Sequence, residues 1–291
     1  MRVTPGRAAA VAAVAAATFL AAAQPSSAAA ARDKPLVYVA LGDSAAAGPG
    51  LPEQDLTRPG CFRSHLNYPS LVAGHIGADV FRDVTCTSAT TKDFTEGQQT
   101  LTGQVPPQYD ALSPDTDLVT VHIGANDIKL VSTVLTCVNL LPDPLGTSCH
   151  DKLTAGGADR VSQQIQDFAS RIGEAARSIR GRAPQARVYF VGYGTYLRPG
   201  GCYPVQPFWS RDADYIQSKL RELNAAIAWQ AGRNGAGYID QTAASVGHDS
   251  CAPFATRWFE GIIKGNVTVP LHPTVLGMQG TSFVVTRALQ R

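Results

Sequence analysis

The sequence has almost no excess of charge of either sign. Its 291 residues include 25 Lys and Arg against 23 Asp and Glu, and no basic run occurs. Proteins that bind nucleic acids display a basic patch or stripe, so no nucleic-acid partner is expected. The chain also lacks a P-loop, a His-Glu-x-x-His, a Cys-x-x-Cys and a Gly-x-Gly-x-x-Gly after a strand. From these absences we predict that the protein has no cofactor and no metal.

Long apolar runs are absent except at the N-terminus. There, Arg2 and Arg7 precede the apolar segment 8–23, and small residues follow it. This order is typical of a cleaved secretory signal peptide, and the run is too short and too rich in alanine for a membrane span. Residues 1–31 are therefore predicted to be a signal peptide, and residues 32–291 a secreted protein with no stable membrane insertion. Loss of the two arginines leaves 23 basic and 23 acidic residues.

All six cysteines lie in the mature part of the chain. An even number of cysteines in an exported protein predicts disulfides, and six cysteines allow 15 pairings. We predict that cysteines adjacent in the sequence pair with each other, giving Cys61–Cys86, Cys137–Cys149 and Cys202–Cys251.

Short apolar runs alternate with segments of helical periodicity. The run 36–41 ends at a glycine and is typical of a buried strand of a parallel sheet. In the segment 158–179, apolar residues recur every three or four positions, as on one face of a helix. The alternation predicts a single α/β domain with a parallel sheet covered on both faces. The other predicted strands are 78–84, 117–123, 186–192 and 237–240. The other predicted helices are 68–76, 209–233 and 274–290, and a further helix is predicted to begin at 128. The segment 94–116 is predicted to form helical turns and loop.

Polar residues follow the first three predicted strands: Ser44, the hydroxyl-rich segment 85–91, and Asn126. The carboxyl ends of parallel strands meet at one edge of the sheet, where ligands bind. A serine becomes a good nucleophile when a histidine takes its proton, and His272 lies in a loop before the last helix. An asparagine amide and backbone N–H groups can stabilise an oxyanion. Alternatively, Ser44 and Asn126 are helix caps.

These residues resemble four sequence blocks of the SGNH-hydrolase (GDSL lipase/esterase) family, in particular its secreted actinobacterial lipase-like esterases. Gly42-Asp43-Ser44 matches the nucleophile block, 85–91 the oxyanion-glycine block, Gly124-Ala125-Asn126-Asp127 the asparagine block and His272-Pro273 the histidine block. The blocks occur in order along the whole mature chain. The resemblance implies a three-layer α/β/α sandwich with a central, mostly parallel five-stranded sheet, the flavodoxin-like fold of that family.

By this resemblance, Ser44 is the nucleophile and His272 the general base and acid. The oxyanion hole is expected to combine the backbone N–H groups of Ser44 and Ser88 with the side-chain amide of Asn126. Ser88 replaces the glycine of the family, so the donor is kept, but the residue can require a φ angle that serine tolerates poorly.

The residue three positions before the histidine, often an acid in the family, is Val269 here. A Ser-His dyad is therefore expected, with the backbone carbonyl of Val269 or a neighbour orienting the imidazole. Asp249, reaching in from another loop, is the weaker alternative. His122 is expected to be a packed core histidine, and the aromatic pairs Phe208-Trp209 and Trp258-Phe259 to be either core or the lining of an acyl site.

The resemblance implies a secreted serine carboxylic-ester hydrolase, a lipase or esterase and possibly a phospholipase, that acts through an acyl-enzyme on a small-molecule or lipid ester. Two alternatives remain open at this point: a polysaccharide O-deacetylase of the same fold, and a glycan-binding relative that has lost catalysis. A monomer is expected.

Overall fold

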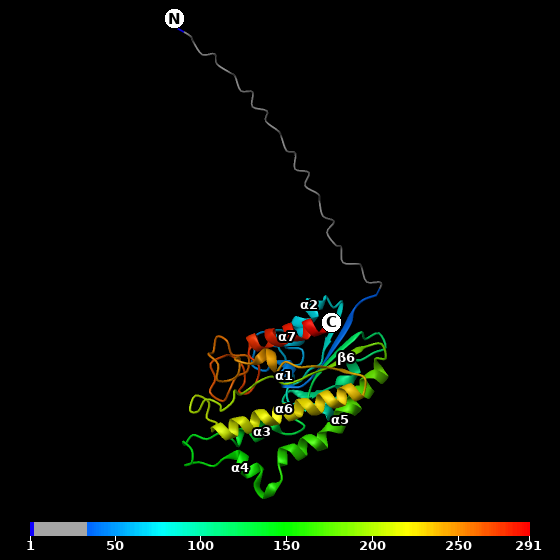
Figure 1. Cartoon of the computed structure of the whole chain (residues 1–291). Helices are drawn as coiled ribbons and strands as arrows, with labels where there is room; N and C mark the ends of the chain where they lie inside the picture. The colour runs from blue at the N-terminus through cyan, green and yellow to red at the C-terminus, as the bar shows by residue number, and fades with distance from the viewer. Residues whose placement is uncertain (3–33) are drawn as a thin grey trace. The chain divides into compact units, whose positions relative to one another are not determined.

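The core of the structure is a five-stranded parallel sheet with the strand order β2-β1-β5-β6-β7. The structure is a computed structural model and describes residues 1–2 and 34–291 (Figure 1). Every residue of β1 and β5 is buried, as expected of central strands covered on both faces. The strands are β1 (Val37–Gly42), β2 (Val80–Asp83), β5 (Leu118–His122), β6 (Arg187–Val191) and β7 (Gly237–Ile239).

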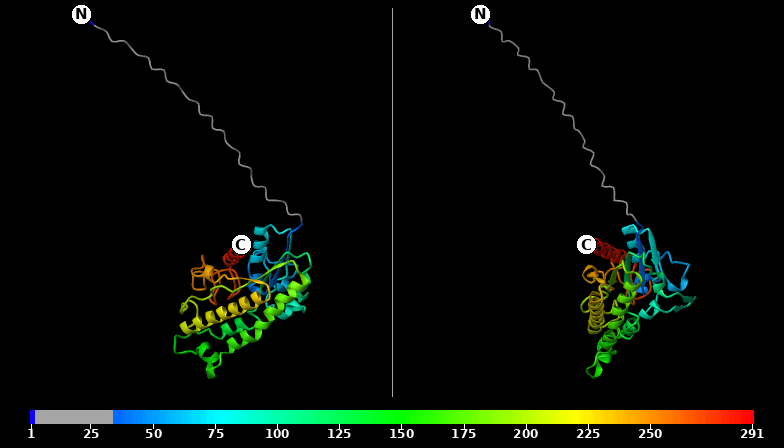
Figure 2. Two further views of the ribbon diagram at one scale, coloured as in Figure 1. Left: turned by 45° about the vertical axis from the view of Figure 1, so that its right-hand side comes forward. Right: turned by 90° about the vertical axis from the view of Figure 1, so that its right-hand side faces the viewer.

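Two layers of helices cover this sheet (Figures 1 and 2). Tyr38 and Ala40 of β1 belong to a core with α2 (Tyr68–Ile76) and α7 (Val275–Leu289). Val39 and Leu41 alternate with them and belong to the core on the opposite side of the strand, which the longer helices cover. These are α5 (Arg160–Arg182) and α6 (Ser210–Arg233). The three-layer α/β/α sandwich predicted from the sequence is confirmed.

Local sequence accounts for the long helices. In α5 the apolar residues of the predicted face are all buried, and burial of one large aliphatic side chain contributes about 1.5–3 kcal/mol. Asp159 caps this helix, since its carboxylate accepts hydrogen bonds from the N–H groups of Val161 and Ser162. The helix ends at Arg182, two residues before a proline that cannot continue it.

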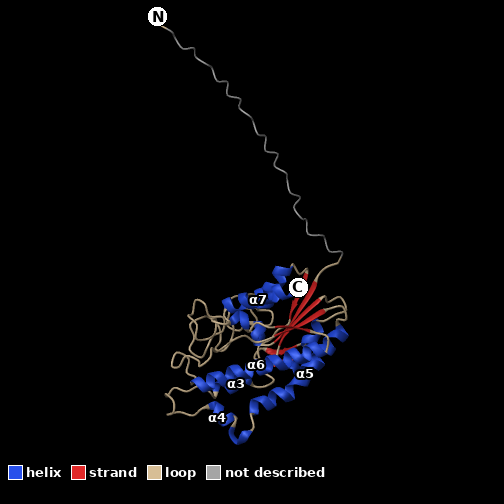
Figure 3. Cartoon of the chain, in the orientation of Figure 1, coloured by secondary structure: helices blue, strands red, loops and turns tan. Residues whose placement is uncertain are grey.

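The segment 94–116 differs from the prediction of helical turns and loop. It contains an antiparallel hairpin of β3 (Gln98–Thr100) and β4 (Gly103–Val105) between two short 3₁₀ helices, Thr91–Phe94 and Gln108–Ala111 (Figure 3). The hairpin strands are mostly polar and half of their residues are exposed, so they lack the apolar alternation that identifies a strand. The short α-helices are α1 (Ser44–Ala47), α3 (Leu130–Leu135) and α4 (Cys149–Leu153).

Three disulfides connect the loops of this fold, and they join Cys61 to Cys86, Cys137 to Cys149 and Cys202 to Cys251, as expected. Lys34–Arg291 form one compact unit. No helix within the described part of the chain is long and apolar enough to cross a membrane. The predicted signal peptide falls, apart from residues 1–2, outside the described residues.

Candidate active site

Ser44 is the first residue of α1, directly beyond the carboxyl end of β1. Strand β1 ends at Gly42, where a Cβ atom would lie 2.6 Å from the carbonyl oxygen of His122, so only glycine fits. Asp43 caps α1, because its Oδ1 accepts a hydrogen bond of 2.8 Å from the N–H of Ala45. These two neighbours place the Ser44 side chain at the edge of the sheet, with 8% of the residue exposed.

The imidazole of His272 contacts Ser44 although 228 residues separate them. The distance between His272 Nε2 and Ser44 Oγ is 2.7 Å, and His272 Nδ1 lies 2.8 Å from the carbonyl oxygen of Pro270. A carbonyl only accepts, so Nδ1 carries the hydrogen and the neutral ring presents Nε2 as an acceptor for the serine hydroxyl. Burial lowers the pKa of His272, which favours this neutral form, although the Pro270 carbonyl acts in the opposite direction.

Of the two options predicted, Val269 or a neighbour, the carbonyl that meets the imidazole belongs to the neighbour, Pro270, and not to Val269 itself. Val269 is turned towards another part of the chain, where its N–H donates to the carbonyl of Pro49. Leu271 has a φ of 63°, and this turn folds the chain so that the Pro270 carbonyl meets the ring two residues later. The alternative acid, Asp249, accepts hydrogen bonds from Arg198 and the N–H of Cys251 instead.

A buried ion pair that sequence reasoning missed supports the loop that carries the histidine. Arg257 and Glu260 are 2% and 0% exposed and are joined by a hydrogen-bonded salt bridge. The N–H of Glu260 donates to the carbonyl of His272 at 2.9 Å. Burial alone would raise the pKa of Glu260, but bonds from Arg257 and two backbone N–H groups lower it. A charged pair three residues apart is common in loops, so the sequence offered no signal of this role.

Ser88 has a φ of 69°, the left-handed conformation that the glycine of this block would adopt freely. Its backbone N–H donates no hydrogen bond within the described residues. The neighbouring carbonyl of Ala89 accepts a bond of 2.9 Å from Asn126 Nδ2, which leaves the second hydrogen of that amide available. A left-handed non-glycine residue costs about 1–3 kcal/mol and persists only where its surroundings hold it.

One apolar pocket opens beside the serine and the histidine. Its volume is about 630 Å³, including the space open to solvent. Ser44, Asn126 and His272 line it together, whereas Ser88 is not among its lining residues. Phe208 lines this pocket, in agreement with the interpretation that the aromatic pairs line an acyl site and do not only belong to the core. Other apolar walls include Leu130, Val131 and Val134 of α3, and Ile216 and Leu220 of α6.

Tyr193, which sequence reasoning also missed, connects the serine block with the asparagine block. Its hydroxyl donates to Asp43 Oδ2 at 3.0 Å and accepts a bond of 2.9 Å from the N–H of Ala125. Burial raises the pKa of Asp43 to about 7, although the hydrogen bonds from the N–H of Ala45 and from Tyr193 act in the opposite direction. His122 packs against the Tyr193 ring and is 2% exposed, as expected of a core histidine, and burial lowers its pKa to about 3.

Metal ligation has no basis in the described residues, where no group of three or more His, Cys, Asp or Glu side chains is placed to hold an ion. The groups around the apolar pocket include a hydroxyl, an imidazole and an amide.

Comparisons with known proteins identify the family of this chain. The model of the GDSL-like lipase/acylhydrolase family matches residues 40–279. The chain is 37% identical to Lipase 2 of Streptomyces coelicolor over 249 residues, which covers 83% of this chain and 82% of that protein. The extracellular lipase of Streptomyces rimosus has the same fold, with a TM-score of 0.72, 26% identity, and coverage of 88% of this chain and all of that one.

A phospholipase A1 from Streptomyces albidoflavus shares the fold with an equal TM-score of 0.72, at 24% identity over 89% of this chain and all of that one. Both the family model and the relative of Streptomyces coelicolor cover most of the chain, and the residues matched by the family model include the serine, asparagine and histidine blocks. The chain is therefore a member of the GDSL-like lipase/acylhydrolase family.

Proposed function

We propose that this family member hydrolyses carboxylic esters through a Ser44–His272 dyad and an acyl-enzyme. The observation that carries the proposal is the 2.7 Å contact between Ser44 Oγ and His272 Nε2. His272 takes the hydroxyl proton as Ser44 attacks the ester carbonyl, and then gives that proton to the leaving alcohol. The same imidazole then deprotonates a water molecule, which attacks the acyl-enzyme, and it returns that proton to the Ser44 oxygen as the acid is released.

The oxyanion formed in each step would be stabilised by three donors. The N–H groups of Ser44 and Ser88 form no hydrogen bonds within the described part of the chain outside helices and strands, and the Asn126 amide has one hydrogen to spare. Donors that are already fixed in place cost no reorganisation when charge develops, and removal of one typically lowers kcat by about 10²–10³.

The pocket favours an acyl group of several carbons over acetyl. Its walls beyond the serine are apolar side chains of α3 and α6 together with Phe208. Burial of each additional methylene contributes about 0.8 kcal/mol, whereas an acetyl group would leave most of this surface uncovered. This supports a lipase or esterase over a polysaccharide deacetylase, in agreement with the names of the relatives in Streptomyces.

Export from the cell is part of the proposal. Three disulfides are expected of a protein that works in an oxidising compartment, and the structurally similar lipase of Streptomyces rimosus is described as extracellular.

The test compares Ser44→Ala with the unchanged protein on p-nitrophenyl esters from acetate to palmitate, and on phosphatidylcholine and acetylated xylan. Ser44→Ala should lose turnover on every ester while melting at an unchanged temperature, and Ser70→Ala on α2 serves as the matched serine control. The unchanged protein should prefer acyl chains longer than acetyl. Near-normal turnover by Ser44→Ala would refute the dyad, and a preference for acetylated xylan would favour the deacetylase.

A further inference from the structure

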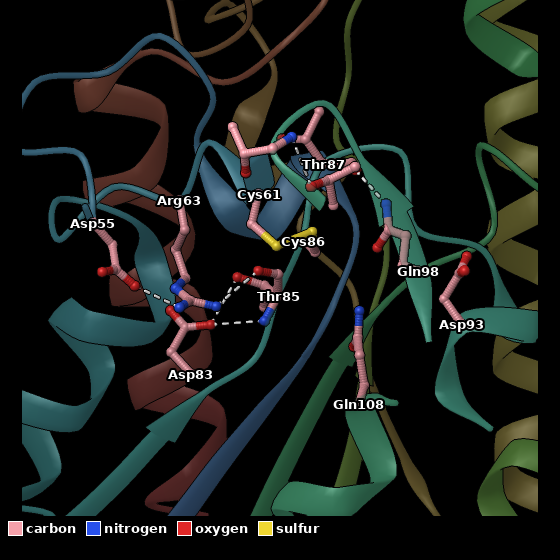
Figure 4. Close-up of a disulfide and its surroundings, with 12 residues drawn as sticks. Asp55, Cys61, Arg63, Asp83, Thr85, Cys86, Thr87, Asp93, Gln98 and Gln108 are labelled. Carbon is pink, nitrogen blue, oxygen red and sulfur yellow. Dashed lines mark hydrogen bonds and ion pairs between the residues drawn. A yellow bond between two sulfur atoms is a disulfide. The ribbon is translucent and has the colours of Figure 1, made fainter. Parts of the chain in front are cut away.

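The Cys61–Cys86 disulfide is attached to the chain just before Ser88, between Thr85 and Thr87, which Figure 4 labels. We define residues 85–91 as the Ser88 segment. Cys86 is two residues before Ser88, is 1% exposed, and its N–H donates to the carbonyl of Gly42 at 3.0 Å. The next N–H, of Thr87, donates to the carbonyl of Cys61, also at 3.0 Å. The disulfide and this hydrogen bond therefore both hold the start of the Ser88 segment against Cys61.

The partner side of the disulfide is itself fixed by Arg63. Its guanidinium pairs with Asp55 at 2.5 Å and donates to the carbonyl of Thr85 at 3.0 Å (Figure 4). Arg63 is 9% exposed, so this charged group is held in one geometry. The Arg63–Thr85 hydrogen bond thus lies beside the Cys61–Cys86 disulfide. Both connect the chain at 61–63 to the start of the Ser88 segment.

The far side of Ser88 is held by different groups. The carbonyl of Ala89 accepts from Asn126, and Thr91 donates to Asp127 through both its N–H and its hydroxyl. Between the two sides, Gln98 Nε2 donates to the carbonyl of Thr87 at 2.7 Å (Figure 4). Ser88 is therefore in its left-handed conformation between two anchored flanks, while the residue itself is exposed.

We propose that the Cys61–Cys86 disulfide positions the Ser88 N–H for the oxyanion, by holding the flank that keeps Ser88 left-handed. This inference depends on the proposed function, because it assumes that the Ser88 N–H contacts the reacting carbonyl oxygen. A serine released on one flank returns to negative φ, which turns its N–H away. The disulfide itself touches no reacting atom and acts through Ser88.

The Cys137–Cys149 disulfide provides a matched comparison. It connects the chain beyond α3 to the start of α4, with a sequence separation of 12 residues against 25 for Cys61–Cys86. No residue of the Ser88 segment belongs to it. Its removal should lower stability through the unfolded chain without moving an oxyanion donor.

The experiment measures kcat and KM on p-nitrophenyl acetate. Hydrolysis of this ester depends on the oxyanion hole, but its short acyl group does not reach the apolar walls of the pocket on α3 and α6. Cys61→Ser/Cys86→Ser should lower kcat about tenfold or more, up to the 10²–10³ typical of a lost donor, with KM unchanged. Cys137→Ser/Cys149→Ser should keep kcat. Both double variants are assayed below their melting temperatures, established by circular dichroism.

Ser88→Gly separates positioning from general stability. Glycine adopts positive φ about as readily as negative φ, so adding Ser88→Gly to Cys61→Ser/Cys86→Ser should recover much of the lost kcat. A purely structural disulfide predicts no such recovery. Should the double variant fail to fold, Gln98→Ala, which frees the Thr87 carbonyl, takes its place with a smaller loss and the same recovery.

An unchanged kcat in Cys61→Ser/Cys86→Ser, or equal losses in the two disulfide variants without recovery by Ser88→Gly, would overturn the inference. Turnover by Ser44→Ala would instead refute the proposed function, so the two failures can be told apart.

Discussion

Ser44 and His272 meet in one site but are held in place by different kinds of contact. Ser44 follows a buried strand, and its neighbours Gly42 and Asp43 set the turn that presents it. His272 lies in an irregular loop, where a buried ion pair and the carbonyl of Pro270 hold it. The nucleophile is thus placed by local sequence and the base by tertiary contacts. Substitutions near Ser44 and substitutions near His272 should therefore differ in their effects on stability and activity.

Glu260→Ala should have the largest effect on the histidine side. It leaves the Arg257 guanidinium buried without its partner and removes the acceptor of two backbone N–H groups. Loss of one member of a buried pair costs about 3–5 kcal/mol, and activity should fall with stability because the same loop carries His272. Chemical denaturation and kcat/KM check both effects.

The control for Glu260→Ala is Lys92→Ala, which breaks the exposed Lys92–Glu96 pair. Such pairs on a surface contribute about 0.2–1 kcal/mol. Equal losses from the buried and the exposed pair would contradict the account of the histidine loop.

Gly42→Ala tests the nucleophile side, with a smaller expected loss of stability. The new methyl group would meet the backbone of His122, which cannot move aside as a flexible side chain would. Overpacking of this kind costs up to about 3 kcal/mol, and the displaced turn should lower kcat. Thermal melting and kcat are the measurements. Gly74→Ala on α2 has open space around the new methyl group and should stabilise the helix by about 0.5–1 kcal/mol; a loss there would show that the clash is not the cause.

Tyr193→Phe tests the connection between the serine and asparagine blocks. It leaves the Ala125 N–H and one oxygen of the Asp43 carboxyl group without the partners they have now. Unpaired buried groups cost about 1–3 kcal/mol, so melting temperature and kcat should both fall modestly. Tyr189→Phe, whose hydroxyl has no described hydrogen bond, should change neither; an unaltered Tyr193→Phe protein would show that the connection is unimportant.

The pH dependence is the smallest predicted effect. Burial lowers the pKa of His272 below its ordinary value of 6.5, so the base stays neutral at pH values where a free histidine is already charged. The acid limb of kcat/KM, which reports the free enzyme, should therefore have its midpoint below 6.5. A midpoint at or above 6.5 would contradict the burial of the imidazole in solution.

The difference between local sequence patterns and tertiary contacts also explains which features could be predicted from the sequence. The five strands of the parallel sheet, α5 and the turn at Ser44 follow from patterns between close neighbours, and their predictions are confirmed. The family blocks indicated the pocket's Ser44, Asn126 and His272, and the doubt over Ser88 was justified by its φ of 69°. The choice of Pro270 over Val269 depends on the turn at Leu271 and on what Val269 meets across the fold.

Tyr193, Arg257 and Glu260 were missed for a similar reason. Their roles arise from burial and from contacts with residues far along the chain, and nothing beside them in the sequence marks those contacts. The hairpin 98–105 was missed because its strands are polar.

The most direct test of the central claim is to trap the nucleophile. Incubation with a fluorophosphonate, followed by peptide mapping by mass spectrometry, should show one modified residue, Ser44, with loss of esterase activity in proportion to the label. His272→Ala should react far more slowly, because the serine then lacks its base. Label on another residue, or full esterase activity in protein labelled at Ser44, would contradict the account.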